Sequence, residues 1–128
     1  MRVLLDTHAL IWWATGDPRL SRRARDLIQD ASNEIVVSAI SALEIAIKAG
    51  RGSLSVGGSA RQFVDDEVLA SGFHPLPLTF DHAVRVHDLP PIHRDPFDRV
   101  LVAQADVEAI PIVTDDPLIR QYPVRVEW

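Results

Sequence analysis

Four acidic residues, far apart in the sequence, are the side chains best suited to chemistry. Asp6 follows a short apolar run, Glu44 interrupts an almost wholly apolar segment, and Asp98 precedes apolar residues at helical spacing. Asp116 lies in a polar turn. Carboxylates that crowd together repel, and some take up protons unless a cation lies between them. Mg²⁺ and Mn²⁺ prefer such oxygen ligands and activate water toward phosphodiesters, so the four acids indicate phosphoryl-group hydrolysis.

Each acid also has a purely structural interpretation. Asp6 and Asp116 have the positions of helix caps, and Glu44 completes a Ser-Ala-Leu-Glu pattern typical of a capping box. Asp98 can be an acid favoured by a helix dipole. Capping is the commoner role for any one of them. It does not explain why Glu44 interrupts an apolar helix or why Asp98 heads an apolar stripe.

The segment around Asp98 shows most clearly an acid placed where an apolar residue is expected. Pro96 has no N–H to lose in a first helical turn, so Asp95 is predicted to be the N-cap of a helix that ends near Ala109. Asp98 then lies in the first turn. Apolar residues follow it at i+3, i+4 and i+7, so a carboxylate stands at the head of the stripe that faces the core. An acid there is costly unless its charge is used.

Strands that alternate with helices are expected to position the four acids. Predicted strands cover residues 2–5, 34–38, 110–113 and 124–126, and 73–78 is at best an edge strand because it contains two prolines. Predicted helices cover residues 8–14, 20–31, 39–49, 60–71, 79–87 and 95–109. This alternation favours an α/β domain with a mainly parallel sheet, in which ligands collect beyond the carboxyl ends of the strands.

Composition excludes several classes of function. The 128 residues, 47% of them hydrophobic, suit a single domain over residues 1–128. There is no cysteine, which excludes disulfides and thiol chemistry and favours a reducing cytoplasm. No apolar stretch reaches the length of a membrane span, and there is no basic leader with a long apolar segment. A net charge of −5 argues against a broad basic nucleic-acid surface, but it is compatible with carboxylates neutralised by divalent cations.

Four sequence blocks together resemble those of PIN-domain nucleases, in particular the VapC-type toxins of prokaryotic toxin–antitoxin pairs. The blocks are LLDTHALIW (4–12), VSAISALEI (37–45), DPFDR (95–99) with VAQA (102–105), and IVTDD (112–116). They occur in the family's order and span nearly the whole chain. The resemblance implies a three-layer α/β/α fold, Mg²⁺- or Mn²⁺-dependent cleavage of RNA, a homodimer and a cognate antitoxin.

The resemblance also implies roles for individual residues. Asp6, Glu44 and Asp98 match the family's three acidic positions, and Asp116 matches a fourth, more variable one. These four residues are therefore expected to hold the metal ion and to be catalytic. Asp95 is better explained as a cap, and Asp115 stays ambiguous.

Further polar residues are candidates for contacts with the carboxylates, with metal-bound water or with substrate. They are Thr7, His8, Ser38, Thr114, Arg94 and Arg99, with Lys48 and Arg51 more remote. A solvated arginine and a structural histidine are the alternatives for the basic members. The histidines lack zinc-ligand spacing. Of the adjacent Trp12 and Trp13, one is expected to pack inward, and the other is either a partner contact or part of the core.

Two other functions remain open at this point. One is a catalytically silent PIN-like module that binds RNA or protein, which the presence of all four acids disfavours. The other is a phosphatase of small molecules, which would need a pocket closed around one phosphate group.

Overall fold

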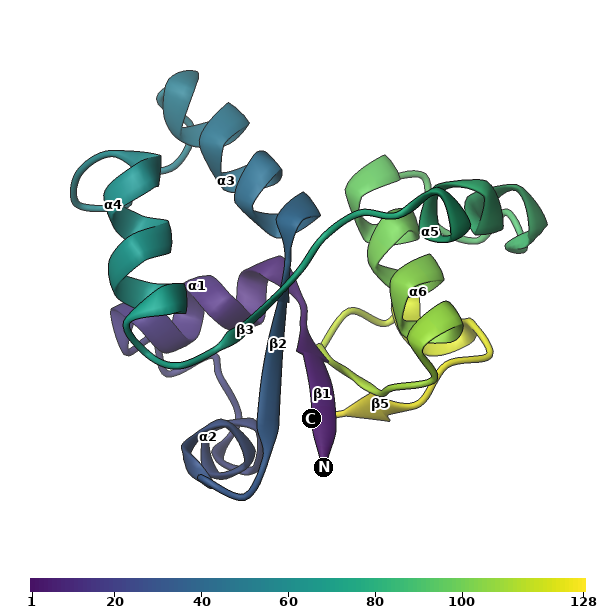
Figure 1. Ribbon diagram of the computed structural model, residues 1–128, viewed down its shortest axis with the longest axis horizontal. Helices are drawn as coiled ribbons and strands as arrows, with labels where there is room; N and C mark the ends of the chain where they lie inside the picture. Colours follow the sequence, from purple (N-terminus) through teal and green to yellow (C-terminus); the bar gives the residue numbers. More distant parts are fainter.

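The computed structural model describes residues 1–128, and its centre is a sheet of five parallel strands (Figure 1). The strands are β1 (Arg2–Leu5), β2 (Glu34–Ser38), β3 (His74–Leu76), β4 (Ile112–Val113) and β5 (Val126–Glu127). Their order in the sheet is β3-β2-β1-β4-β5. The sheet is therefore wholly parallel rather than mainly parallel, and the Pro-containing β3 lies at its edge as predicted.

Helices cover both faces of this sheet. They are α1 (Thr7–Thr15), α2 (Arg22–Gln29), α3 (Ala39–Gly50), α4 (Ala60–Val64), α5 (Phe80–Arg85) and α6 (Pro96–Glu108). Short 3₁₀ turns follow at Val86–Asp88 and Ile119–Gln121. None of the helices has both the length and the apolar character needed to cross a membrane.

The strand residues divide the core into two parts. Val3 and Leu5 of β1 pack on one face with residues of α1, α2 and α4, whereas Leu4 packs on the other face with residues of α6. This alternation follows from the two-residue period of a strand, and a strand buried on both faces needs apolar residues throughout. The fold is thus the three-layer α/β/α arrangement that the resemblance implies.

Three element boundaries differ from prediction. The helix predicted over residues 60–71 divides into α4 and a π-helical turn, Asp65–Leu69. The strand predicted over 110–113 shortens to Ile112–Val113. The last strand is Val126–Glu127 and not 124–126, because it pairs in register with β4 and that pairing has no local sequence signal.

Strand order reverses direction at β1. The chain proceeds outward from β1 to β2 and β3, then returns to place β4 and β5 on the other side of β1. In parallel sheets such a reversal opens a crevice beyond the carboxyl ends of the strands. Leu5 pairs with Val113 at these ends, so the residues that follow β1 and β4 lie side by side.

Candidate functional site

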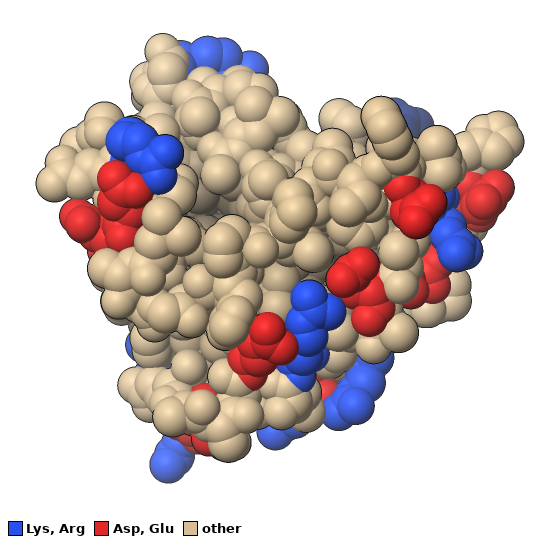
Figure 2. Space-filling model, viewed as in Figure 1, with Lys and Arg blue, Asp and Glu red and all other residues tan.

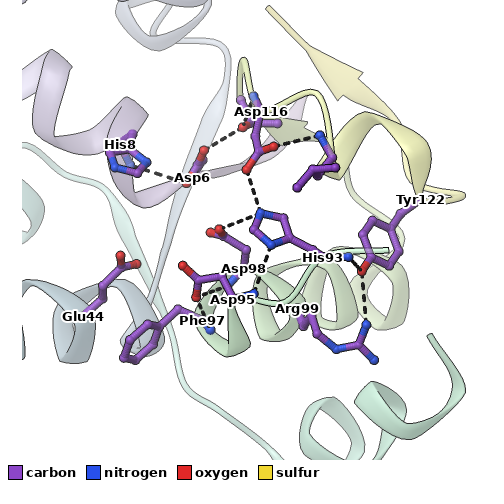
Figure 3. A network of polar contacts seen from close by, with 12 residues as sticks. Asp6, His8, Glu44, His93, Asp95, Phe97, Asp98, Arg99, Asp116 and Tyr122 are labelled. Carbon is purple, nitrogen blue, oxygen red and sulfur yellow. Dashed lines mark hydrogen bonds and ion pairs between the residues drawn. The ribbon is translucent and has the colours of Figure 1, made fainter. Parts of the chain in front are cut away.

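The four predicted acids meet at the crevice beside β1. Asp6 is the N-cap of α1, directly after β1, and Asp116 follows β4. Glu44 lies on α3, and Asp98 lies in the first turn of α6. Figure 3 shows their side chains converging from these four segments. Asp6 and Glu44 are each only 2% exposed and Asp98 only 8%, so three carboxylates are buried together.

A buried threonine joins the two acids that follow β1 and β4. The Thr114 hydroxyl donates a hydrogen bond to Oδ2 of Asp6 over 2.6 Å and accepts one from the Asp116 N–H over 3.0 Å. Burial raises the pKa of the Asp6 carboxyl, and the negative charge of Asp116 adds to this rise. The Thr114 hydrogen bond and the positive charge of His8 oppose it by favouring the ionised form.

Asp98 has the most strongly perturbed carboxyl group. Its pKa is raised to about 7, chiefly by burial, and the negative charges of Asp6 and Asp95 add to the effect. His93 lowers it, and Glu44 raises it further. These electrostatic contributions show that the acids interact although they lie up to ninety residues apart in the sequence. A carboxylate in this position gains most from a nearby cation.

Glu44 has one carboxylate oxygen without a partner. Its Oε2 lies 2.5 Å from Nζ of Lys48, one helical turn further along α3. Its Oε1 is buried and accepts no hydrogen bond. Buried polar atoms almost always have a hydrogen-bond partner, so we expect this oxygen to contact a water molecule or a cation. The same ion pair raises the pKa of Lys48.

His93 is the one site residue whose role sequence reasoning missed. Its Nε2 lies 3.0 Å from Oδ2 of Asp98 and 2.9 Å from Oδ2 of Asp116 (Figure 3). The only local signal was its position two residues before the N-cap of α6. Ligand atoms of these three residues lie within 4.8 Å of one another, a spacing at which they could surround a cation.

The predicted cap at Asp95 is confirmed. Its Oδ1 accepts hydrogen bonds from the N–H groups of Phe97 and Asp98, so the carboxylate turns back onto α6. Glu44, by contrast, forms no capping box, because Ser38 is the N-cap of α3. Asp116 does not cap a helix either, because the N-cap of the 3₁₀ turn Ile119–Gln121 is Leu118. Its Oδ1 instead accepts from the Leu118 N–H in a local turn, while its other oxygen faces the site.

The remaining predicted contacts divide between the site and the scaffold. Thr114 contacts Asp6, as described, and the His8 N–H donates to the same carboxylate. Ser38 and Thr7 instead donate to Gln104 and Ser41, beneath the crevice.

The two arginines near Asp98 have different surroundings. Arg94 is exposed. The guanidinium of Arg99 donates to the carbonyls of Val86 and Pro90 and to the Tyr122 hydroxyl, so its donors are engaged within the chain.

A cavity of about 210 Å³ opens beside the acids. It extends from Glu44 past Lys48 toward Arg19 and His8, and Trp12 forms part of its wall. The Arg19 guanidinium lies 4.8 Å from the centre of the Trp12 ring. Trp12 is buried and Trp13 half-buried, so the first of the two tryptophans packs inward. Basic groups thus line the approach to a strongly acidic centre.

The donor set fits a hard divalent cation. All the groups aimed into the crevice are carboxylates, apart from the His93 imidazole and the Thr114 hydroxyl. Mg²⁺ and Mn²⁺ prefer oxygen ligands from a few carboxylates. Such an ion would give Oε1 of Glu44 a partner. It would also stabilise the ionised carboxylates of Asp6 and Asp98, whose pKa values are raised.

Several solved structures share this fold. A chain of VapBC2 from Rickettsia felis, bound to a DNA fragment from its promoter, aligns with a TM-score of 0.74 and 16% identity over 100% of this chain and 99% of that one. A toxin–antitoxin complex from Klebsiella pneumoniae aligns with a TM-score of 0.67 and 19% identity over 98% of this chain and 96% of that one. FitAcB from Neisseria gonorrhoeae aligns with a TM-score of 0.65 and 19% identity over 97% of this chain and 95% of that one.

The sequence comparison agrees with the structural one. No curated protein matches the chain. The profile of the PIN domain, however, matches residues 3–124, which include all four acids and His93. A match of this extent, together with the parallel sheet and its acidic crevice, places the chain in the PIN domain family.

Proposed function

We propose that this protein is a metal-dependent endoribonuclease and the toxin of a toxin–antitoxin pair. The observation that carries the proposal is the meeting of Asp6, Glu44, Asp98 and Asp116 at the crevice, with a buried Glu44 oxygen that has no partner. Membership of the PIN family supports nuclease chemistry. The fold shared with VapBC and FitAcB supports the role of a toxin.

The chain's own residues have distinct tasks in this proposal. Asp6, Asp98, Glu44 and Asp116 would hold Mg²⁺ or Mn²⁺. When bound, the ion supplies the positive charge that makes water a stronger nucleophile and stabilises the leaving oxygen. The Thr114 hydrogen bond orients the Asp6 carboxylate and favours its ionised form against the effect of burial.

Basic residues beside the acids support a polyanionic substrate. Lys48, Arg19 and His8 line the cavity that borders Glu44. Lys48 is paired with Glu44 and Arg19 with Asp17, so a chain of phosphates that runs past them toward the crevice would share these cations with the acids. The cavity is open along this path, whereas a small-molecule phosphatase would need a pocket closed around one phosphate. We therefore favour RNA as substrate.

A cleavage assay separates this function from its rivals. The purified protein, free of antitoxin, is incubated in Mn²⁺ with labelled single-stranded RNA, with DNA of the same sequence and with p-nitrophenyl phosphate. We expect cuts in the RNA only, and we expect Asp98→Asn to abolish them while Asp115→Asn, at an exposed neighbour, leaves them unchanged. RNA binding without cleavage indicates a silent binding module, and turnover of p-nitrophenyl phosphate alone indicates a phosphatase.

Exposed apolar side chains support protein partners, namely an antitoxin and a second copy of the chain. Phe80 and Val84 of α5 are 90% and 67% exposed, and Leu43 and Ile47 of α3 are also exposed. Figure 2 shows that few charges lie in the middle of this face, between α3 and α6. Patches of this kind mark interaction sites.

The partner proposal is tested by co-expression with the product of the adjacent small reading frame and by measurement of the oligomeric state. We expect a stable complex and loss of cleavage. A chain that stays monomeric and active beside that product would refute both partners.

A further inference from the structure

His93 occupies a point between two of the carboxylates that come from different parts of the fold. Its side chain is 11% exposed, and its Nε2 lies 3.0 Å from Asp98 and 2.9 Å from Asp116. Asp98 belongs to α6, and Asp116 belongs to the turn after β4. No other side chain contacts both of these acids.

The second ring nitrogen defines what His93 can do. Nδ1 accepts a hydrogen bond from the backbone N–H of Asp95 over 3.1 Å. An acceptor nitrogen carries no proton, so the neutral ring has its proton on Nε2, which faces the two carboxylates. Nε2 therefore acts as a hydrogen-bond donor. A metal ligand would instead need a free electron pair on that nitrogen.

The backbone of His93 is also fixed. Its N–H donates to the Tyr122 hydroxyl over 2.7 Å, and the same hydroxyl accepts from Arg99 over 3.1 Å. Arg99 in turn holds the carbonyl of Pro90. Tyr122 is buried, so the loop before α6 is tied to the core and the imidazole has a defined place.

We propose that His93 is a positioning residue that joins Asp116 to the metal site: its Nε2–H donates a hydrogen bond to Asp116 and lies 3.0 Å from Oδ2 of Asp98. The inference rests on the proposed metal-dependent function. Two carboxylates at this separation repel. The Leu118 N–H holds Oδ1 of the half-buried Asp116, and His93 fixes the direction of its Oδ2 toward the site. The bridge holds one oxygen of each acid and leaves the other oxygen of Asp98 for the ion.

Two substitutions at residue 93 separate this role from simple packing. His93→Leu introduces an apolar side chain of similar size and removes the N–H donor. In His93→Gln the amide nitrogen reaches the position of Nε2, so the N–H donor is kept. We measure the Mn²⁺ dissociation constant by titration calorimetry. Outer hydrogen-bond partners of metal ligands contribute about 10-fold or more in affinity, so we expect that loss in His93→Leu and recovery to within about 3-fold in His93→Gln.

Controls identify which idea fails. His87→Leu, at an exposed histidine, should not change Mn²⁺ affinity, and circular dichroism of the metal-free variants checks folding. In an Asp116→Asn background the effect of His93→Leu should shrink. If the wild-type protein binds Mn²⁺ and His93→Leu binds it equally well, the positioning role is wrong. If the wild-type protein binds no Mn²⁺ and does not cut RNA, the proposed function fails as well.

A spectroscopic readout tests the ring itself. Nitrogen NMR of the metal-free protein should show a protonated Nε2 and an unprotonated Nδ1 at His93, and addition of Mg²⁺ should leave this tautomer unchanged. A proton on Nδ1, or a Nε2 that loses its proton when Mg²⁺ binds, would make His93 a direct ligand and overturn the inference.

Discussion

Replacing Asp98 by asparagine should stabilise the metal-free protein while it removes activity. The pKa of Asp98 is about 7 in the folded protein, against an ordinary value of 3.8. Between these values the folded state holds a proton that the unfolded chain has lost. Because the folded pKa is raised, the carboxyl group destabilises the fold progressively as pH rises from about 4 to about 7, and the full cost remains above that window.

The difference between about 7 and 3.8 corresponds to about 4 kcal/mol. Water reaches part of the side chain and screens its charge, so we take roughly half of this, ~2 kcal/mol, as the gain expected from Asp98→Asn at pH 8. In a domain of this size that gain corresponds to a rise of roughly 6–10 °C in melting temperature. The His93 hydrogen bond goes to Asp116, and asparagine keeps an oxygen that can face His93, so little is lost in exchange.

The assay is thermal unfolding in chelator at pH 5 and pH 8, with Asp115→Asn as the matched exposed control. We expect the stabilisation by Asp98→Asn at pH 8, a much smaller one at pH 5, and no effect of Asp115→Asn at either pH. Addition of Mn²⁺ should raise the melting temperature of the wild-type protein and so reduce the difference between it and Asp98→Asn. Equal stability of Asp98→Asn and wild type at pH 8 without metal would refute the reasoning.

Three further changes test other parts of the site. Thr114→Val removes the hydrogen bond to Asp6 and should raise the pKa of that carboxyl further, so half-maximal Mn²⁺ binding should require a higher pH; an unchanged pH profile would contradict this. Lys48→Met leaves the buried Glu44 carboxylate without its cation, which should cost about 1–3 kcal/mol in metal-free urea unfolding and make the Mn²⁺-induced rise in melting temperature larger than in wild type. Asp95→Ala removes the α6 cap and should cost about 1 kcal/mol of unfolding free energy, whereas Asp95→Asn should retain most of it.

The sequence predicted those parts of the site that depend on a single helix or strand. The Asp95 cap and the first-turn position of Asp98 followed from one proline and one apolar stripe, and the structure has both. The interruption of an apolar helix by Glu44 indicated that capping alone does not explain this residue, and the structure buries it at the crevice. The edge position of β3 followed from its prolines. In each case the signal lay within about ten residues of the feature.

Features that depend on distant pairing had no such signal. Nothing near His93 indicates that its ring bridges Asp98 and Asp116, because Asp116 is 23 residues away and reaches it only through the sheet. Arg99 was a candidate for a substrate contact because it adjoins Asp98, and no local signal indicated that it hydrogen-bonds to Pro90 and Tyr122. The start of β5 depends on its register with β4.

The pairing of β1 with β4 determines when the acidic crevice can assemble. Leu5 and Val113 are neighbours in space but are separated by most of the chain, so this contact forms only after a large loop has closed. A nascent polypeptide on the ribosome carries Asp6 and Glu44 long before β4 and the Asp116 turn have been translated. Chains that stop upstream of β4 therefore lack Asp116 and the strand that places it, so they cannot assemble the four-acid crevice.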